Sequence, residues 1–332
     1  MPEIRIDPLS GHRTIVAGER SRRPGGEPTC APPEEIDTAK DPFADGHEGR
    51  TPPELDAVRA EGAPSDSPGW SVRVVPNLYP ALDGAAGGGR RPPSPAGEGV
   101  ADMFSPLPAT GAHEVIVNGP QSVLSLAELP VEQVVAAVEV WRRRMRAHAG
   151  SAYLQLIVNE RREAGASLPH THAQLYALDF VPAAIARERE RASAYTTRTM
   201  GQNLLGDLVA EEVRRRERIV AIDEEAVLLA PYASRLPFQL MLAPRTPRAR
   251  FEDDGPSGAA LLHDGLSRLA RHLGSSPPLN LWVRTAPLGA EDFCWRIDVM
   301  PRLTHLAGLE LSTEVNLNIV APEDAAAALR AA

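Results

Sequence analysis

The feature that most constrains the fold of this chain is an ordered run of one strand, one helix and two further strands, which occurs twice. In the first run we expect strands at 113–119, 153–160 and 170–178, because β-branched and aromatic residues are concentrated there. The helix lies between Pro130 and Gly150, where Val, Trp and Met side chains recur at a spacing of three and four residues.

The second run follows the same order over a longer stretch. Its expected elements are a hairpin at 218–232, strands at 238–245, 280–287 and 294–303, and a helix at 256–273. A charged helical region at 183–217 separates the runs, and a strand at 310–322 and a helix at 322–331 end the chain. The repetition predicts an α+β fold of two similar halves, 1–182 and 183–332, with antiparallel sheets and helices packed on them.

Two segments lack this regularity. Residues 21–68 are dense in Pro, Gly and acidic residues, so irregular coil is expected, and residues 81–110 are poorer still in core-forming residues and predict a long loop. Between them the sequence WSVRVVPNLYP at 70–80 predicts a strand that ends in a turn.

The composition argues against several classes of protein. A formal net charge of -9 makes a broad basic surface for duplex nucleic acid unexpected. Cys30 and Cys294 are far apart in sequence, which predicts neither a disulfide framework nor a Cys-rich metal site. The apolar runs fall short of the roughly 20 residues that cross a bilayer, and the first residues lack the apolar core of a signal peptide. We therefore expect a cytoplasmic protein that binds neither nucleic acid nor membranes.

The most informative window, at 159–178, contains the sequence His-Thr-His-Ala-Gln. On a strand His170, His172 and Gln174 are two residues apart, so their side chains share one face. Just upstream, a glycine and Ser167 lie in a short loop whose backbone amides can approach an anion closely.

This motif alone is compatible with three interpretations. An imidazole with one nitrogen fixed as a donor keeps a free lone pair on the other and can attack phosphorus, and His172 is the candidate for this role. Gln174 would then hydrogen-bond a nonbridging phosphoryl oxygen. A His-x-His pair also occurs as half of a metal site or as a structural pair, and spacing does not decide among the three.

Further segments carry a resemblance to a known family. The motif is preceded by Ala-Gly-Ala-Ser, and the other matching segments are 5–24, 73–82, 111–120 and 237–245, with MPRLTHLAGLEL and APEDAAAALR near the end. In this order they resemble the galactose-1-phosphate uridylyltransferase family, a branch of the histidine-triad superfamily. The resemblance implies two histidine-triad-like halves, of which the first carries the motif, and a homodimer.

The resemblance also implies an activity and the residues that perform it. Members move a nucleoside monophosphate between sugar phosphates or phosphate acceptors, so the expected partners are a nucleotide sugar and a sugar phosphate. His172 matches the nucleophile that forms a covalent nucleotidyl-histidine, and Gln174 matches the residue that binds the transferred phosphoryl group. We expect Ser167 and His170 to belong to the same catalytic group. Glu310 matches a residue that contacts a sugar hydroxyl. The positions that line the nucleotide site are Arg20, Arg23, Asn77, Asn159 and Ser167. The sequence around the motif looks closer to the ADP-sugar phosphorylase-like branch, and UMP and AMP both stay open.

The chain departs from the family at two metal sites. Asp41, Ala44 and Ser122 stand at three of the positions that hold a structural zinc in many relatives, and only His170 remains. One imidazole cannot hold a tetrahedral zinc. The positions that match a second metal site are Glu188, Arg284, Arg296 and Asp298, and arginine does not bind a cation. We therefore expect no metal cofactor, with His47 and His113 as the alternative ligands of a replacement site.

Two other functions stay open. A nucleotide-binding paralogue with altered or lost catalysis, for example in a specialised biosynthetic pathway, would agree with the loss of both metal sites. Hydrolysis of dinucleoside polyphosphates, as in smaller histidine-triad relatives, is disfavoured because those proteins have a further histidine where this chain has Gln174.

Overall fold

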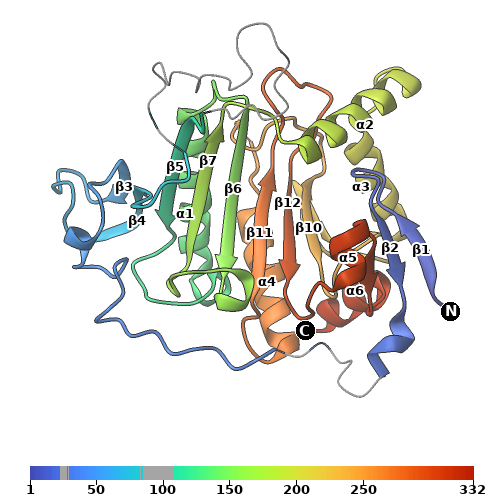
Figure 1. Cartoon of the computed structure of the whole chain (residues 1–332), viewed down its shortest axis with the longest axis horizontal. Coiled ribbons are helices and arrows are strands. Elements are labelled where there is room, and N and C mark those ends of the chain that lie inside the picture. The colour runs from blue at the N-terminus through green and yellow to red at the C-terminus, as the bar shows by residue number, and fades with distance from the viewer. Residues whose placement is uncertain (23–27, 29, 83, 85–107, 254) are drawn as a thin grey trace, which may run out of the picture.

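The computed structural model describes all residues of the chain except 23–27, 29, 83, 85–107 and 254. The described part contains two β-sheets and six α-helices (Figure 1). Most of the loop predicted at 81–110 lies outside the described residues, and so does Arg23.

One large antiparallel sheet crosses the molecule. Its ten strands are, in order across the sheet, β3 (Asp56–Arg59), β4 (Trp70–Pro76), β5 (Gly111–Val117), β7 (His172–Leu178), β6 (Tyr153–Glu160), β11 (Leu279–Arg284), β12 (Arg296–Pro301), β10 (Leu240–Pro244), β9 (Ala226–Leu229) and β8 (Ile219–Ile222). Each strand predicted in the two repeated runs is present within a few residues of its expected bounds, which confirms this part of the sequence analysis.

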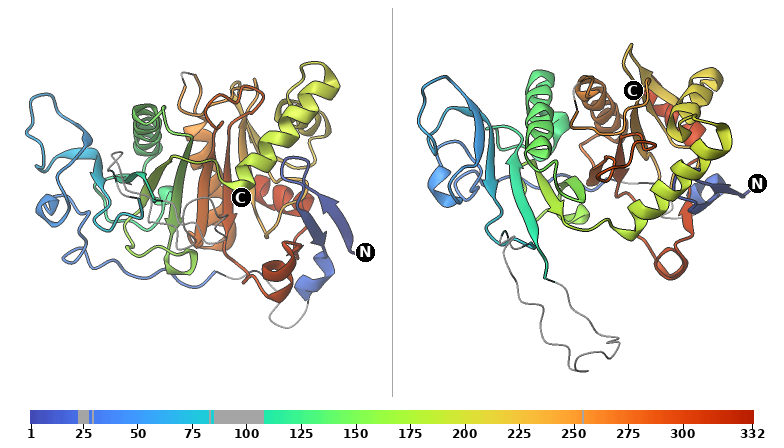
Figure 2. Two further views of the ribbon diagram at one scale, coloured as in Figure 1. Left: turned by 45° about the horizontal axis from the view of Figure 1, so that its top comes forward. Right: turned by 90° about the horizontal axis from the view of Figure 1, so that it is seen from above.

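Helices cover the two faces of the sheet unequally. The helices α1 (Val131–Ala147) and α4 (Ala259–Leu273) lie on one face, and α6 (Pro322–Ala331) packs beside α4. Figure 2 shows α2 (Ala183–Thr199) on the opposite face, and α3 (Leu204–Arg215) follows it in the chain. Trp141 of α1 is fully buried in the same apolar cluster as Leu156 and Leu175 of the sheet. The face opposite α1 and α4 is called the open face below.

The strand order is the same in the two halves of the sheet, read from opposite edges. From one edge the order is β3, β4, β5, β7 and β6, and from the other edge it is β8, β9, β10, β12 and β11. Along the chain, α1 connects β5 to β6 in the first half, and α4 connects β10 to β11 in the second half. The duplicated α+β architecture with antiparallel sheets is therefore confirmed. The boundary at residue 182 stays a prediction, because the sheet continues through β6 and β11.

A small second sheet contains β1 (Glu3–Ile6), β2 (Arg13–Val16) and β13 (Asn316–Asn318). It lies beside the second half of the large sheet (Figure 1). The strand predicted at 310–322 is wrong in its first part, because the helix α5 (Gly308–Thr313) occupies it. The Glu310 carboxylate accepts a hydrogen bond from the backbone N–H of Ala307 at 3.0 Å, which caps this helix at its start.

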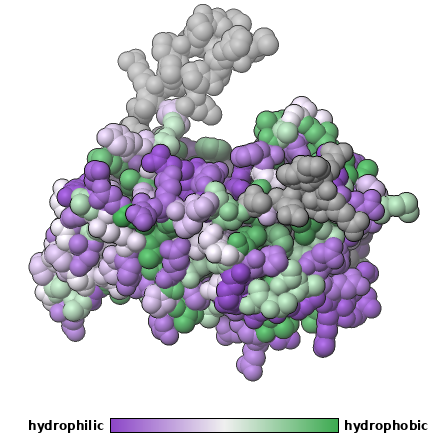
Figure 3. Space-filling model, turned by 90° about the horizontal axis from the view of Figure 1, so that it is seen from below, coloured by the Kyte–Doolittle hydropathy of each residue, from purple (hydrophilic) through white to green (hydrophobic). Residues whose placement is uncertain are grey.

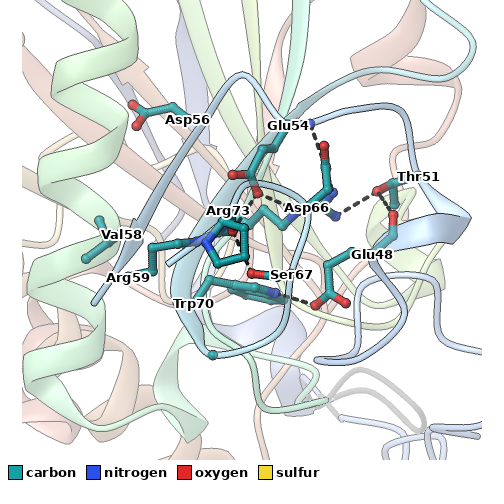
Figure 4. A network of polar contacts seen from close by, with 12 residues as sticks. Glu48, Thr51, Glu54, Asp56, Val58, Arg59, Asp66, Ser67, Trp70 and Arg73 are labelled. Atoms are coloured by element: carbon teal, nitrogen blue, oxygen red, sulfur yellow. Dashed lines mark hydrogen bonds and ion pairs between the residues drawn. The ribbon is translucent and has the colours of Figure 1, made fainter. Parts of the chain in front are cut away.

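A buried arginine ties the segment before β4 to the sheet (Figure 4). Arg73 of β4 donates hydrogen bonds to Thr51 at 2.7 Å, to Asp66 at 2.6 Å and to Glu54 at 3.2 Å. The irregular coil predicted at 21–68 is therefore only partly correct, since β3 forms within it. The β3 sequence, Asp-Ala-Val-Arg, is short and polar, and pairing with β4 stabilises it as a strand.

The surface agrees with the composition. Figure 3 shows hydrophilic and hydrophobic residues interspersed over the face seen from below. Within the described residues, no helix combines the length and the apolar character that a membrane span requires.

Candidate active site

The strand β7 presents the motif on the open face. Ala173 and Leu175 point into the buried cluster under α1, so His172 and Gln174 point to the other side of the sheet. On the neighbouring strand β5, Val117 pairs with His172 and Val115 with Gln174. The predicted placement on one strand face is therefore observed for His172 and Gln174. The strand predicted at 170–178 begins at His172, so His170 precedes it.

One nitrogen of His172 is fixed and the other is free. Nδ1 lies 2.8 Å from the backbone oxygen of His170, so Nδ1 carries the proton and donates to that carbonyl. No described residue hydrogen-bonds to Nε2. The ring makes an edge contact with Phe43 at a centroid distance of 5.2 Å. Burial is the largest influence on the pKa of His172 and lowers it, so the ring is neutral and Nε2 keeps its lone pair.

A second histidine, His113, which the sequence suggests only as an alternative metal ligand, fixes the amide of Gln174. The backbone N–H of Ala81 donates to Nδ1 of His113 at 3.1 Å, so the ring proton sits on Nε2. That nitrogen lies 3.0 Å from Oε1 of Gln174 and donates to it. The Tyr176 hydroxyl donates to the same oxygen at 3.1 Å. The Gln174 NH₂ group therefore points away from both donors and is available to a ligand.

The two asparagines of the proposed nucleotide site lie close to this cluster. Asn77 Nδ2 is 3.1 Å from His113 Nε2, so Asn77 and Gln174 compete for one ring nitrogen. The backbone N–H of Ala81 donates to Nδ1 of His113 and thereby places the ring proton on Nε2. Nε2 therefore bonds to the acceptor oxygen of Gln174 and not to the NH₂ group of Asn77. Asn159 directly follows Val158, whose pairing with Ala173 is the last between β6 and β7, so its side chain lies on the face that carries His172. Its Oδ1 accepts a hydrogen bond from Asn280 at 2.8 Å.

Ser167 lies in the loop between β6 and β7, as expected. Its side chain is exposed and lines a pocket of about 270 Å³ together with Lys40, Arg161 and Arg162. Gly165 in the same loop has a φ of 90°, a left-handed conformation that glycine adopts without strain.

Arg20 and Glu310 lie elsewhere in the molecule. Arg20 is exposed in the short helix Gly18–Arg22 that follows β2, and Glu310 belongs to α5, which precedes β13. Because β2 pairs with β13, both residues flank the small sheet, beside the second half of the molecule (Figure 1). The chain therefore does not bring either residue to His172, which belongs to the first half.

The residues at the zinc positions form an ion pair instead of a metal site. His170 is fully buried, with Nδ1 at 2.7 Å from Asp41 Oδ2 and Nε2 at 2.8 Å from the backbone oxygen of Gly119. Both nitrogens face acceptors, so both carry protons and neither offers a lone pair to zinc. Ser122 donates to the same Asp41 oxygen at 2.6 Å. Burial alone would raise the pKa of Asp41, but the hydrogen bonds from His170 and Ser122 lower it.

The residues at the second metal position are also paired with one another. Arg296 donates to Glu188 at 2.9 Å and to Asp298 at 3.1 Å, and Arg284 lies 3.7 Å from Glu188. Two guanidinium groups fill the place of cation ligands, so these side chains do not fit a metal ion. Over the described part of the chain, no three His, Cys, Asp or Glu side chains gather in a geometry that would hold a metal.

This geometry defines a class of protein. Two repeated α+β halves share one sheet, and one half carries a neutral histidine with a free nitrogen next to an oriented amide. Histidine-triad-like nucleotidyltransferases have this arrangement.

Comparison with known proteins assigns the family. The profile described as "Galactose-1-phosphate uridyl transferase, N-terminal domain" matches residues 1–182, and a profile described as a domain of unknown function matches residues 129–331. The chain therefore belongs to the galactose-1-phosphate uridylyltransferase family, which confirms the resemblance seen in the sequence.

Two relatives and one solved structure support this assignment to the family. The chain is 26% identical to "ADP-glucose phosphorylase" of Arabidopsis thaliana over 99% of this chain and 92% of that protein. It is 28% identical to "Probable galactose-1-phosphate uridylyltransferase" of Drosophila melanogaster over 76% of this chain and 68% of that protein. A crystal structure of an ADP-glucose phosphorylase from Arabidopsis thaliana with bound ADP-glucose has a TM-score of 0.80 and 25% identity, and it covers 100% of this chain and 99% of that one.

Proposed function

We propose that the protein transfers a nucleoside monophosphate between phosphate-bearing acceptors through a covalent intermediate on His172. The observation that carries this proposal is the asymmetric hydrogen bonding of the His172 ring. Nδ1 donates to the His170 carbonyl and Nε2 has no partner among the described residues. A buried, neutral imidazole in this state is a nucleophile.

The chemistry follows from the same geometry. In the first step a bond forms between Nε2 and the phosphorus that carries the nucleoside, the bond from that phosphorus to the bridging oxygen breaks, and the sugar phosphate leaves with the electron pair. The ring then carries a positive charge, which the His170 carbonyl stabilises through Nδ1–H. In the second step an oxygen of the acceptor phosphate attacks phosphorus, the nitrogen–phosphorus bond breaks, and neutral His172 is restored.

Gln174 acts on the phosphoryl oxygens during both steps. Its carbonyl oxygen is occupied by His113 and Tyr176, so its NH₂ group can donate to a nonbridging oxygen. A neutral donor suits this role because it does not repel the negative phosphoryl group.

We further propose that the transferred group is AMP and that the donor is an ADP-sugar. The support is the extent of the match with ADP-glucose phosphorylase, which spans nearly the whole of both chains, and the TM-score of 0.80 with its ADP-glucose-bound structure. Inorganic phosphate is then the acceptor, and the products are a sugar phosphate and ADP.

The experiment is a mass measurement on the intact protein. The protein is incubated with ADP-glucose or UDP-glucose without an acceptor, and a gain of one AMP on His172 is expected with the first donor. His172→Ala should gain nothing, whereas His263→Ala, which removes an imidazole from α4 on the other face of the sheet, should react like the wild type. Nucleotide binding without an adduct, unchanged in His172→Ala, would identify a nucleotide-binding paralogue.

We also propose that the protein acts as a homodimer in which Arg20 and Glu310 serve the site of the neighbouring subunit. The support is their position beside the small sheet, away from His172 in the same chain. Two inactive variants, His172→Ala and Glu310→Gln, test this when they are mixed under conditions that exchange subunits. After random exchange of an equal mixture, about half of the dimers are heterodimers, and each heterodimer contains one intact site of two. The mixture should therefore regain about a quarter of the wild-type activity. A mixture as inactive as its components would overturn the shared site.

A further inference from the structure

A separate pocket of about 150 Å³ lies on the open face of the second half. The helices α2 and α3 and the turn between β1 and β2 form its walls, and side chains of β10, β11 and β12 form its floor. Two strands, β6 and β11, stand between β12 and β7, which places the floor strand β12 roughly 14 Å from the strand of His172. The proposed transfer reaction does not use this pocket.

The pocket is the counterpart of the candidate active site in the other half of the sheet. The strand β12 holds the place that β7 holds in the first half, next to the strand nearest the centre. Arg296 and Asp298 point from β12 to the open face, as His172 and Gln174 do from β7, because Ile297 lies in the buried cluster on the helix side. The second half thus presents charged groups where the first presents a nucleophile.

Two carboxylates of the pocket, Glu188 of α2 and Asp298 of β12, already have arginine partners. Glu188 accepts from Arg296 at 2.9 Å and lies 3.7 Å from Arg284. Asp298 accepts from Arg296 Nε at 3.1 Å and from the Trp282 indole N–H at 3.0 Å. Burial opposes ionisation of Arg296, but the charges of Asp298 and Glu188 outweigh it and raise its pKa. Arg296 is therefore fully matched by two carboxylates.

Two further arginines are left with unused donors. Arg235 donates to Met300 Sδ at 3.1 Å, and no carboxylate among the described residues lies within ion-pair distance of its guanidinium group. Arg284 has a buried Nε without a hydrogen-bond partner. The guanidinium carbons of Arg235 and Arg284 each lie 5.6 Å from the centroid of the Trp282 ring, so two positive charges flank one indole.

The arginines and carboxylates that line the pocket are equal in number, but they are not evenly paired. Four arginines, Arg187, Arg235, Arg284 and Arg296, share the lining with four carboxylates, Asp7, Glu188, Glu212 and Asp298. Arg296 pairs with Glu188 and Asp298, and Arg284 lies near Glu188. Burial is the largest influence on the pKa of Arg235 and lowers it, whereas the Asp298 and Asp7 carboxylates act in the opposite direction from beyond ion-pair distance. Arginine keeps its proton at neutral pH, so the Arg235 guanidinium group offers a positive charge and free N–H donors to an anion in the pocket.

We propose that this pocket binds a small oxyanion, inorganic phosphate or the phosphoryl group of a small phosphate ester, between Arg235 and Arg284. Guanidinium groups bind phosphate oxygens through paired N–H donors, and both arginines have donors to spare. The cavity volume admits a compact ligand of this kind.

Calorimetric titration of the full-length protein with inorganic phosphate tests the proposal. Arg235→Gln should weaken binding at this site at least tenfold. Arg284→Gln should act in the same direction. The matched control is Arg245→Gln, which removes an exposed arginine whose contacts are backbone carbonyls, and it should bind like the wild type. Crystals soaked in selenate should show an anomalous peak between Arg235 and Arg284, and titration with glycerol phosphate separates an ester from the free ion.

The outcomes distinguish this site from the catalytic one. Arg235→Gln should still gain a nucleotide on His172, so failure of the transfer proposal and failure of this one are separate results. Arg235→Gln removes a charge that has no ion-pair partner among the described residues, so its melting temperature should not fall, and Arg284→Gln provides the test if it does. Equal phosphate affinity in the wild type and both variants, or a selenate peak only outside the pocket, would overturn the proposal.

Discussion

Nε2 of His113 lies 3.0 Å from Oε1 of Gln174, and this contact makes the orientation of the Gln174 amide depend on the tautomer of a neighbouring ring. The tautomer depends in turn on one backbone N–H, that of Ala81. A glutamine amide has an oxygen at one end and a nitrogen at the other, so a flip would present the wrong group to the phosphoryl oxygens. His113 is therefore a positioning residue for Gln174.

Replacing His113 by Phe should slow nucleotidyl transfer about tenfold, because Gln174 would keep only the Tyr176 hydroxyl as a donor to its oxygen. Single-turnover formation of the adduct on His172 measures the effect, and the loss should fall on the rate and not on donor affinity. His113→Gln restores an N–H donor and should recover part of the rate. An unchanged rate in the double variant His113→Phe with Tyr176→Phe would show that neither group orients the amide.

Replacing Asp41 by Ala should lower the free energy of unfolding by about 3 kcal/mol, because it leaves the buried His170 without its counter-charge. Urea denaturation measures this change. Asp37→Ala is the matched control in the same segment, since its carboxylate is exposed and pairs with Lys40 on the surface, and it should leave stability almost unchanged. Equal losses in the two variants would contradict the proposed role of the buried pair.

Glu160 should make stability fall as the pH rises from about 4.5 to about 7. Burial raises the pKa of Glu160 to about 7, although it accepts hydrogen bonds from Ser125 and from the Leu126 amide. The folded state therefore holds a proton that the unfolded state loses at lower pH, and the cost reaches about 3 kcal/mol above pH 7. Glu160→Gln stays neutral, so the variant should gain stability relative to the wild type between pH 5 and 8. A pH-independent difference in urea denaturation would refute this assignment.

Glu114 should act with the opposite sign in a lower pH range. Burial would raise its pKa, but hydrogen bonds from His148 and Arg144 lower it to about 2. Its contribution is complete above about pH 4.5 and is lost as the pH falls towards 2. The advantage of the wild type over Glu114→Gln, up to about 3 kcal/mol at pH 6, should therefore vanish near pH 2. Acid titration of both proteins, followed by circular dichroism, measures this difference.

The sequence predicts the elements that have a clear period and fails where long-range contacts decide. The strand of His172 alternates between buried and polar residues, so both its position and the face of its motif are predictable. The short strand at Asp56–Arg59 has no such pattern and depends on pairing with β4. The helix at Gly308–Thr313 was missed because a strand-like segment follows it directly, and its cap depends on Glu310.

The same limit applies to the site. The role proposed for His172 rests on a local motif, whereas the partner of His170 is Asp41, which lies 129 residues away in the chain. The contact between His113 and Gln174 requires the register of β5 against β7, which no local pattern determines. The positions of Arg20 and Glu310 depend on β13 pairing with β2, and a single sequence does not show that pairing.

The ladder between β6 and β11 joins the halves through five residue pairs. A fragment that ended at residue 182 would leave the outer backbone groups of β6 unsatisfied, and a strand with a free edge pairs readily with another chain. Such a fragment would tend to self-associate edge to edge through β6, in the place that β11 occupies here. Covalent linkage of the halves thus protects the molecule from aggregation at its own midline.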